Sequence, residues 1–266
     1  MNLCFFFEGT GGGVSGNFTN VSRLFGVCRE TDAQKRHLES GPGTHFGAYV
    51  RGAIHGHDWW LVFRGARRWF EANFRPARPS AEAARVFVFG FSRGALIARH
   101  FSAWLEKLDV KVAYMGLWDT VDATLGIDVS ETCPANVDSA RHAVSRDEKR
   151  RFYGYVPLLP AKEPGARQKV EELVFPGYHS DVGGYYEDNH VIADAALEWV
   201  AEGAMRSGML IDEERLRRMY HPQGTAAKVH DSTGEFSNLW GALGGAARTL
   251  KGLAFHPLCR ICEAVL

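Results

Sequence analysis

The sequence predicts an α/β fold in which a mainly parallel sheet carries helices on both faces. Apolar runs that read as buried strands occur at about residues 3–7, 85–89, 111–117 and 170–175. Segments whose apolar side chains recur at helical spacing separate these runs. Strands that alternate with helices are typical of parallel sheets, where reactive groups collect beyond the carboxyl ends of the strands. We therefore expect the functional residues at that edge.

Composition limits the class of protein further. The chain has 266 residues, and no low-complexity linker or shift in composition divides it, so we expect one domain over residues 1–266. Basic and acidic residues balance at 31 each, which gives no reason to expect a nucleic-acid partner. No basic start marks a signal peptide, and no apolar run approaches the roughly 20 residues of a membrane span. We expect a protein made in the cytoplasm.

Apolar residues at helical spacing, together with Gly and Pro residues that end helices, predict the remaining elements. The expected helices cover Asn17–Val27, about Phe46–Phe74, the segment from Arg93 to about Leu108, Val191–Ser207 and a further segment beginning near Ile211. A short helix at Ser139–Arg146 and a short strand at Arg151–Leu159 are also predicted, while residues 28–46 are expected to form a loop.

Residues 208–266 are expected to form a helical C-terminal part. Its apolar tail suits a docked terminal helix, with a lid or membrane-facing segment as the alternative. Cys259 and Cys262 lie one helical turn apart on this tail, without a second cysteine pair that would complete a zinc site. The pattern favours two buried thiols over a redox or metal role.

Ser92 stands in the most informative motif of the chain. It is the centre of G-x-S-x-G between an apolar strand and a helix, where Gly90 and Gly94 permit a sharp turn. Such a turn exposes the serine hydroxyl at the sheet edge. The Arg93 N–H, at the start of the following helix, then points toward any anion that forms there.

The other predicted strand ends carry Gly9–Gly13, Asp119 and His179. The order Ser92, Asp119, His179 is that of α/β-hydrolases. Ser92 would be the nucleophile, His179 its general base, and Asp119 the carboxylate that orients the imidazole. An oxyanion hole would combine the Arg93 N–H with an N–H from Gly9, Thr10 or Gly11.

Several alternatives stay open at this point. Asp181 and Asp122 are rivals of Asp119 for the carboxylate role. Glu8, Asp119, His179 and Asp181 could instead hold the metal ion of a metal-dependent hydrolase. A binding module without activity is a further class, which the complete Ser, Asp and His set disfavours. The glycine-rich loop lacks the Lys-Ser/Thr of a nucleotide site, and no cofactor is expected.

Five motifs, taken together, resemble a known family. They are Phe7–Thr10, Gly90–Ala95, Leu117–Val121, Arg141–Ala143 and Gly177–Gly184, which read FEGT, GFSRGA, LWDTV, RHA and GYHSDVGG. Their combination resembles the α/β-hydrolase-like catalytic domain of the Tle-type phospholipase effectors of type VI secretion, over roughly residues 3–200. The family usually has F-D-G-T where this chain has Glu8.

The resemblance implies hydrolysis of glycerophospholipid acyl esters, with Ser92, Asp119 and His179 as the matching catalytic residues. It further implies delivery into the periplasm of a target cell, a component of the secretion apparatus as partner, and an immunity protein in the producing cell. A non-secreted carboxylesterase that acts on a smaller ester is the alternative.

Overall fold

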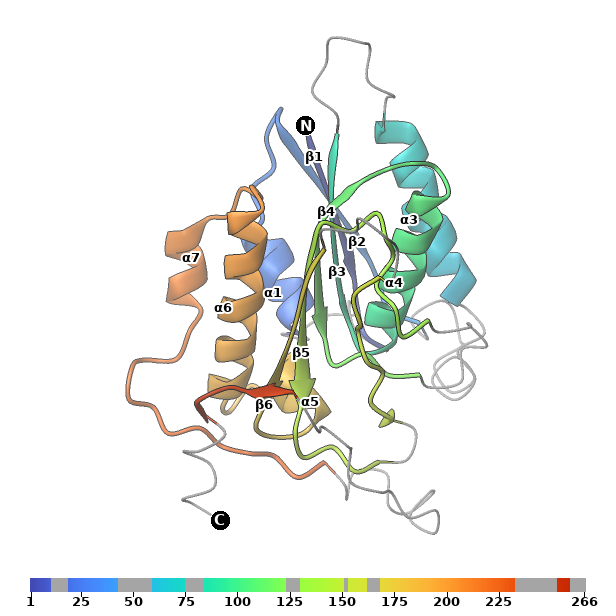
Figure 1. Cartoon of the computed structure of the whole chain (residues 1–266). Coiled ribbons are helices and arrows are strands. Elements are labelled where there is room, and N and C mark those ends of the chain that lie inside the picture. Colours follow the sequence, from blue (N-terminus) through green and yellow to red (C-terminus); the bar gives the residue numbers. More distant parts are fainter. Residues whose placement is uncertain are drawn as a thin grey trace.

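The computed structural model describes residues 1–10, 19–42, 59–74, 84–122, 130–150, 153–161, 168–232 and 253–258. Within these ranges the chain forms a seven-stranded sheet in the order β2-β1-β3-β4-β5-β6-β7, and every neighbouring pair is parallel (Figure 1). The strands are β1 (Asn2–Phe7), β2 (Gln34–Glu39), β3 (Arg85–Phe91), β4 (Val112–Trp118), β5 (Ser139–Ser145), β6 (Lys169–Phe175) and the two-residue β7 (Ala254–Phe255).

Helices cover both faces of the sheet, which explains the continuous apolar runs of β1, β3 and β4. In β1, Phe5 and Phe7 join the core on one face, whereas Cys4 and Phe6 join the core on the other. Alternate side chains of a strand point to opposite faces, so a strand between two helical layers needs apolar side chains, or polar ones paired within the protein, on both faces. The predicted α/β class, with helices on both faces, is confirmed.

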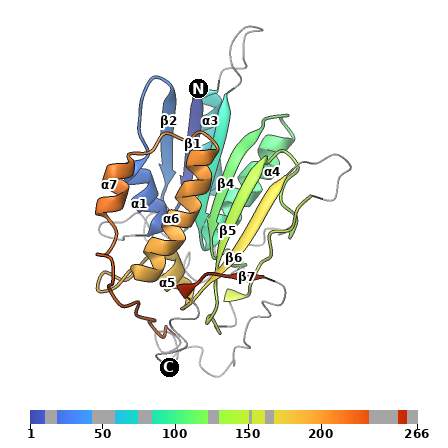
Figure 2. The same cartoon turned by 60° about the vertical axis from the view of Figure 1, so that its left-hand side comes forward.

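The helices divide into two layers and one short turn at the sheet edge. One layer contains α3 (Trp59–Asn73) and α4 (Arg93–Glu106), and the other contains α1 (Asn20–Val27), α6 (Val191–Arg206) and α7 (Glu213–Arg218) (Figures 1 and 2). The short α5 (His179–Gly183) follows β6 and packs against α6 and β5.

The strand order reverses direction between β1 and β3. From β1 the chain proceeds to β2 on one side, and β3 then pairs with β1 on the other side. At such a switch point the loops after the two strands diverge and leave a crevice at their carboxyl ends. The loop that starts at Glu8 and the turn at Ser92 follow these two strands.

Two sequence predictions near the sheet are wrong. Residues 34–39, expected in a loop, form the edge strand β2, whose polar sequence QKRHLE lacks the apolar run of a central strand. The helix expected at Ser139–Arg146 is the central strand β5. Its Arg141 is buried because Glu171 and Glu202 pair with its guanidinium, so a charged residue occupies a core strand.

The predicted strand at Arg151–Leu159 is also wrong for its described residues, where Tyr155 and Leu159 form only isolated bridges. Predicted helices agree with α1, α4 and α6 to within about three residues at their described ends. Of the long helix predicted at Phe46–Phe74, α3 accounts for the described part, and residues 46–58 lie outside it.

The C-terminal part is less helical than expected where the structure describes it. Residues 208–232 and 253–258 contain α7, a segment without helix at 221–232, and the strand β7. Cys259 and Cys262 lie outside the described residues. In the described part of the chain, no helix has both the length and the apolar character needed to cross a membrane.

Candidate active site

Ser92 occupies a strained turn between β3 and α4. Its backbone has φ 59° and ψ −129°, a conformation that residues other than glycine rarely adopt. A Cβ on Gly94 would lie 2.3 Å from the carbonyl oxygens of Phe7 and Glu8, and a Cβ on Gly90 would lie 2.6 Å from Ala95. Both glycines are therefore required by close backbone approach, as the G-x-S-x-G motif predicted.

Asp119 lies immediately after β4 and is almost completely buried. Its Oδ2 accepts a hydrogen bond from His179 Nδ1 at 2.6 Å, and from the Ser145 hydroxyl at 3.0 Å. Its Oδ1 accepts from the Ser145 backbone N–H at 2.8 Å. Since three donors satisfy the carboxylate, it is held in one orientation toward the imidazole.

His179 begins α5 and is held between aromatic rings. The Phe91 ring stacks on it with a centroid separation of 4.6 Å, and the Tyr153 ring meets it edge-on at 4.8 Å. Burial lowers the pKa of His179, while the hydrogen bond and the charge of Asp119 oppose this effect. Because a carboxylate only accepts hydrogen bonds, Nδ1 carries the proton and Nε2 of the neutral ring is free to accept one.

Phe91, the residue directly before Ser92, stacks on His179, and the Ser92 N–H donates to the carbonyl of Trp118, the residue directly before Asp119, at 3.1 Å. Among the described residues, no hydrogen bond joins Ser92 Oγ to the imidazole. Catalytic hydrogen bonds are often long without substrate, so this separation is compatible with a nucleophile and its base. The structure thus joins Asp119 to His179 directly, and the residues next to Ser92 and Asp119 in the chain supply the contacts that connect the serine turn to this pair.

The rival carboxylates lie elsewhere. Asp181, although only two residues from His179, accepts hydrogen bonds from the Tyr178 N–H at 2.8 Å and from His230 Nδ1 at 2.6 Å. Asp122 is exposed to solvent. Neither aspartate makes a hydrogen bond to the His179 ring, so the geometry favours Asp119 over both.

The expected oxyanion-hole residues lie beside the serine where they are described. Arg93 is the first residue of α4, and Gly9 is so close that a Cβ on it would lie 3.3 Å from Ser92 Cβ. Thr10 follows Gly9 and is half-buried. Gly11 lies outside the described residues.

Glu8 is fully buried below this loop, and its carboxylate accepts from the Thr19 hydroxyl at 2.7 Å. Burial raises the pKa of Glu8 to about 7, against the opposing effect of the Thr19 hydrogen bond. Thr19 is also the N-cap of α1, because it accepts from the Ser22 N–H. Glu8 therefore links the glycine loop to the start of α1.

The four residues of the metal alternative do not converge. Glu8 bonds to Thr19 and Asp181 to His230, away from the pair of Asp119 and His179. Among the described residues, the one set with metal-ligand proximity consists of His190, Asp194 and His221. There Arg23 forms a buried ion pair with Asp194.

Three neighbours of the site went unrecognised in the sequence. Ser145 ends β5, and a correct strand prediction there would have placed it at the reactive edge beside Asp119. Glu148 accepts from the His179 backbone N–H at 3.3 Å, and Tyr153 contacts the imidazole edge-on. No spacing rule marks Glu148 or Tyr153, since both lie in irregular chain after β5.

The parallel sheet, the strained serine turn and the Asp119–His179 pair have the arrangement of the α/β-hydrolase fold. Residues 101–203 match the family model described as "T6SS, Phospholipase effector Tle1-like, catalytic domain". The resemblance to type VI secretion phospholipase effectors is confirmed. The matched segment contains Asp119 and His179, while Ser92 precedes it.

Three solved structures serve for comparison, and the first of them shares the fold. An uncharacterized protein from Pseudomonas aeruginosa matches with a TM-score of 0.53 and 18% identity, over 79% of this chain and 46% of that one. The Tle1 effector bound to the VgrG spike of the type 6 secretion system matches with a TM-score of 0.49 and 18% identity, over 70% and 51%. The RedJ thioesterase of Streptomyces coelicolor matches with a TM-score of 0.43 and 13% identity, over 76% and 89%.

The chain thus spans about half the length of the first two structures that it matches. None of the curated proteins matches its sequence.

Proposed function

We propose that the chain is a phospholipase A-type serine esterase, which hydrolyses acyl esters of glycerophospholipids through an acyl-enzyme. The observation that carries the proposal is the 2.6 Å hydrogen bond between Asp119 and His179 next to the strained turn at Ser92. The Tle1-like match over residues 101–203 supports a phospholipid as the substrate.

In the first half-reaction, Ser92 Oγ attacks the ester carbonyl while His179 Nε2 accepts the hydroxyl proton. The negative charge on the tetrahedral intermediate is stabilised by the Arg93 N–H and by an N–H of the loop at Gly9, with the positive end of α4 behind it. His179 then donates its proton to the leaving lysophospholipid oxygen as the carbon–oxygen bond breaks, which leaves the acyl chain on Ser92.

In the second half-reaction, a water molecule takes the place of the leaving group. His179 accepts its proton, the hydroxide attacks the acyl carbon, and the proton returns to Ser92 as the fatty acid leaves. Asp119 stays ionised throughout and stabilises the imidazolium that forms in each half-reaction. Its fixation by Ser145 supports this role, because a mobile carboxylate would not hold the ring in one tautomer.

The decisive measurement is fatty-acid release from phosphatidylethanolamine and phosphatidylglycerol vesicles by the wild type and by Ser92→Ala. We expect release by the wild type alone, together with labelling of Ser92 by a fluorophosphonate. Equal release by both proteins would contradict the mechanism. Activity confined to soluble short-chain esters would instead support a carboxylesterase for smaller substrates.

We extend the proposal to the biological setting: the enzyme acts as a type VI effector in the periplasm of a target cell. The family match supports this role, and the similar Tle1 effector is bound to a VgrG spike. A component of the secretion apparatus and an immunity protein would then be its partners. Growth inhibition on directing the wild type, but not Ser92→Ala, to the periplasm of a Gram-negative test strain would test the setting.

A further inference from the structure

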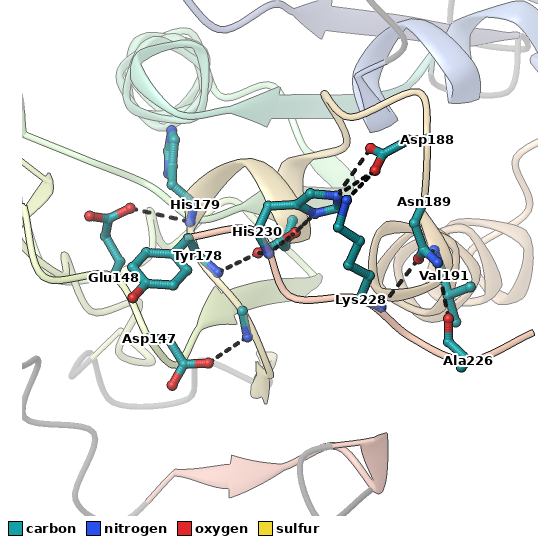
Figure 3. Close-up of polar contacts among 12 residues, drawn as sticks. Asp147, Glu148, Tyr178, His179, Asp188, Asn189, Val191, Ala226, Lys228 and His230 are labelled. Atoms are coloured by element: carbon teal, nitrogen blue, oxygen red, sulfur yellow. Dashed lines mark hydrogen bonds and ion pairs between the residues drawn. The ribbon is translucent and has the colours of Figure 1, made fainter. Parts of the chain in front are cut away.

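Residues 221–232, here called the strap, follow α7 and lie against the turn that carries His179. The loop before α6 fastens the strap at several points. Asn189 Nδ2 donates to the Ala226 carbonyl at 3.0 Å, and the Lys228 N–H donates to Asn189 Oδ1 at 3.4 Å. The Lys228 ammonium forms an ion pair with Asp188 (Figure 3).

His230 makes the innermost contact of the strap. Its Nδ1 donates to Asp181 Oδ1 at 2.6 Å, and its Nε2 lies 3.0 Å from Asp188 Oδ1 (Figure 3). The Tyr186 ring stacks on the imidazole at a centroid separation of 4.0 Å. Both ring nitrogens face carboxylates, so the His230 ring bridges Asp181 and Asp188.

Asp181 links His230 to the turn that carries His179. Its buried carboxylate also accepts from the N–H of Tyr178, the residue directly before His179, at 2.8 Å. On the opposite side of the turn, Asp147 accepts from the Gly177 N–H at 2.7 Å and Glu148 accepts from the His179 N–H at 3.3 Å (Figure 3). The backbone around His179 is thus held from two sides, and one side depends on Asp181.

We propose that His230 is a positioning residue for His179, because it holds Asp181 in the place from which Asp181 fixes the turn. The inference rests on the proposed esterase function, in which His179 Nε2 must reach the Ser92 hydroxyl. Misplacement of a catalytic group by about 1 Å can lower a rate by up to about 100-fold. His230 itself touches no reacting atom.

The electrostatics of Asp181 agree with this role. Burial raises the pKa of Asp181, while hydrogen bonds from Tyr178 and His230 oppose the rise. Without the hydrogen bond from the His230 ring, the buried carboxylate would bind a proton more readily, and its hold on the Tyr178 N–H would weaken. The His230 backbone N–H, at 3.2 Å from Asp181 Oδ2, would remain as a weaker donor.

Two substitutions test the contacts of His230 Nδ1 and Nε2 separately. His230→Asn keeps a donor near the position of Nδ1, facing Asp181, whereas His230→Gln keeps a donor near Nε2, facing Asp188. With p-nitrophenyl butyrate as substrate, we expect His230→Gln to lower kcat about tenfold with KM unchanged, and His230→Asn to retain most of kcat. Asn189→Ala, which loosens the strap without touching Asp181, should lower Tm and leave kcat near the wild-type value.

Equal kcat in all variants, equal losses in the Asn and Gln variants, or an effect on KM alone would overturn the inference. If the wild type releases fatty acid neither from this ester nor from phospholipid vesicles, the proposed function fails separately. The downfield proton resonance of His179 Nδ1–H then reports the position of the ring. Its loss in His230→Gln but not in His230→Asn would support positioning by His230, and an unchanged resonance in both would contradict it.

Discussion

Asp119 Oδ2 accepts a hydrogen bond from His179 Nδ1 over 2.6 Å, although 60 residues separate the two in the sequence. The contact joins the end of β4 to the turn after β6, across the intervening strand β5. Ser145, at the end of β5, donates two hydrogen bonds to the same carboxylate. Three adjacent parallel strands therefore bring Asp119, Ser145 and His179 together at one edge of the sheet.

The first prediction ranks the carboxylates. Asp119→Asn places an amide against His179 Nδ1 and favours the wrong tautomer, so kcat should fall by about 10⁴. Asp181→Asn leaves the Asp119–His179 pair intact and should lower kcat far less. Steady-state kinetics on a soluble ester measures both, with Tm as a control for folding. A larger loss in Asp181→Asn would transfer the acid role to Asp181.

The second prediction concerns the close backbone approach at the serine turn. Gly94→Ala would force a Cβ to within 2.3 Å of two carbonyl oxygens of the β1 loop. Neither carbonyl can yield without moving that loop, so we expect a loss of about 1–3 kcal/mol in the free energy of unfolding. Gly154→Ala is the matched control, because a Cβ there meets no atom within 4 Å. Urea denaturation of the two variants should separate them, and equal stabilities would contradict the packing argument.

The third prediction concerns the acid limb of the pH profile. His179 must be neutral to accept a proton, and burial lowers its pKa below the ordinary 6.5. The base form therefore persists below pH 6.5, and kcat/KM on a soluble ester should fall only as pH drops through the lowered pKa. In Asp119→Asn the limb should move to still lower pH, since the carboxylate raises this pKa. A limb above pH 6.5 in the wild type would contradict the geometry.

The fourth prediction concerns Glu8 and stability. Its folded-state pKa of about 7 lies above the ordinary 4.5, so the folded state binds the proton more tightly than the unfolded state does. The stability that Glu8 contributes is complete below about pH 4.5 and is lost as pH rises to about 7, to a limit of about 3 kcal/mol. Glu8→Gln cannot ionise, so this decline should disappear in urea denaturation measured across pH.

Glu198→Gln serves as the control for that experiment, because Glu198 is exposed on α6. It should leave the decline between pH 4.5 and 7 in place. A wild-type stability that is flat over this range would contradict the assignment of a raised pKa to Glu8.

The sequence predicted the elements that are determined by residues within a single segment of the chain. The apolar runs of β1, β3 and β4 require helices on both faces, and G-x-S-x-G after such a run requires a sharp turn. The edge strand β2 escaped prediction because one side of it faces no neighbouring strand and its side chains are polar. The central strand β5 escaped because Arg141 is neutralised by glutamates from β6 and α6, which are distant in sequence.

By itself, the sequence determined the α/β class, the serine turn and the approximate strand ends, since each depends on the order of apolar and small residues within one segment. Only the tertiary structure decided which aspartate lies behind His179. Asp181 is closer in sequence, yet its side chain bonds to the Tyr178 N–H and to His230, whereas the sheet brings Asp119 to the imidazole. Here the order of the strands, not proximity along the chain, decides which aspartate contacts His179.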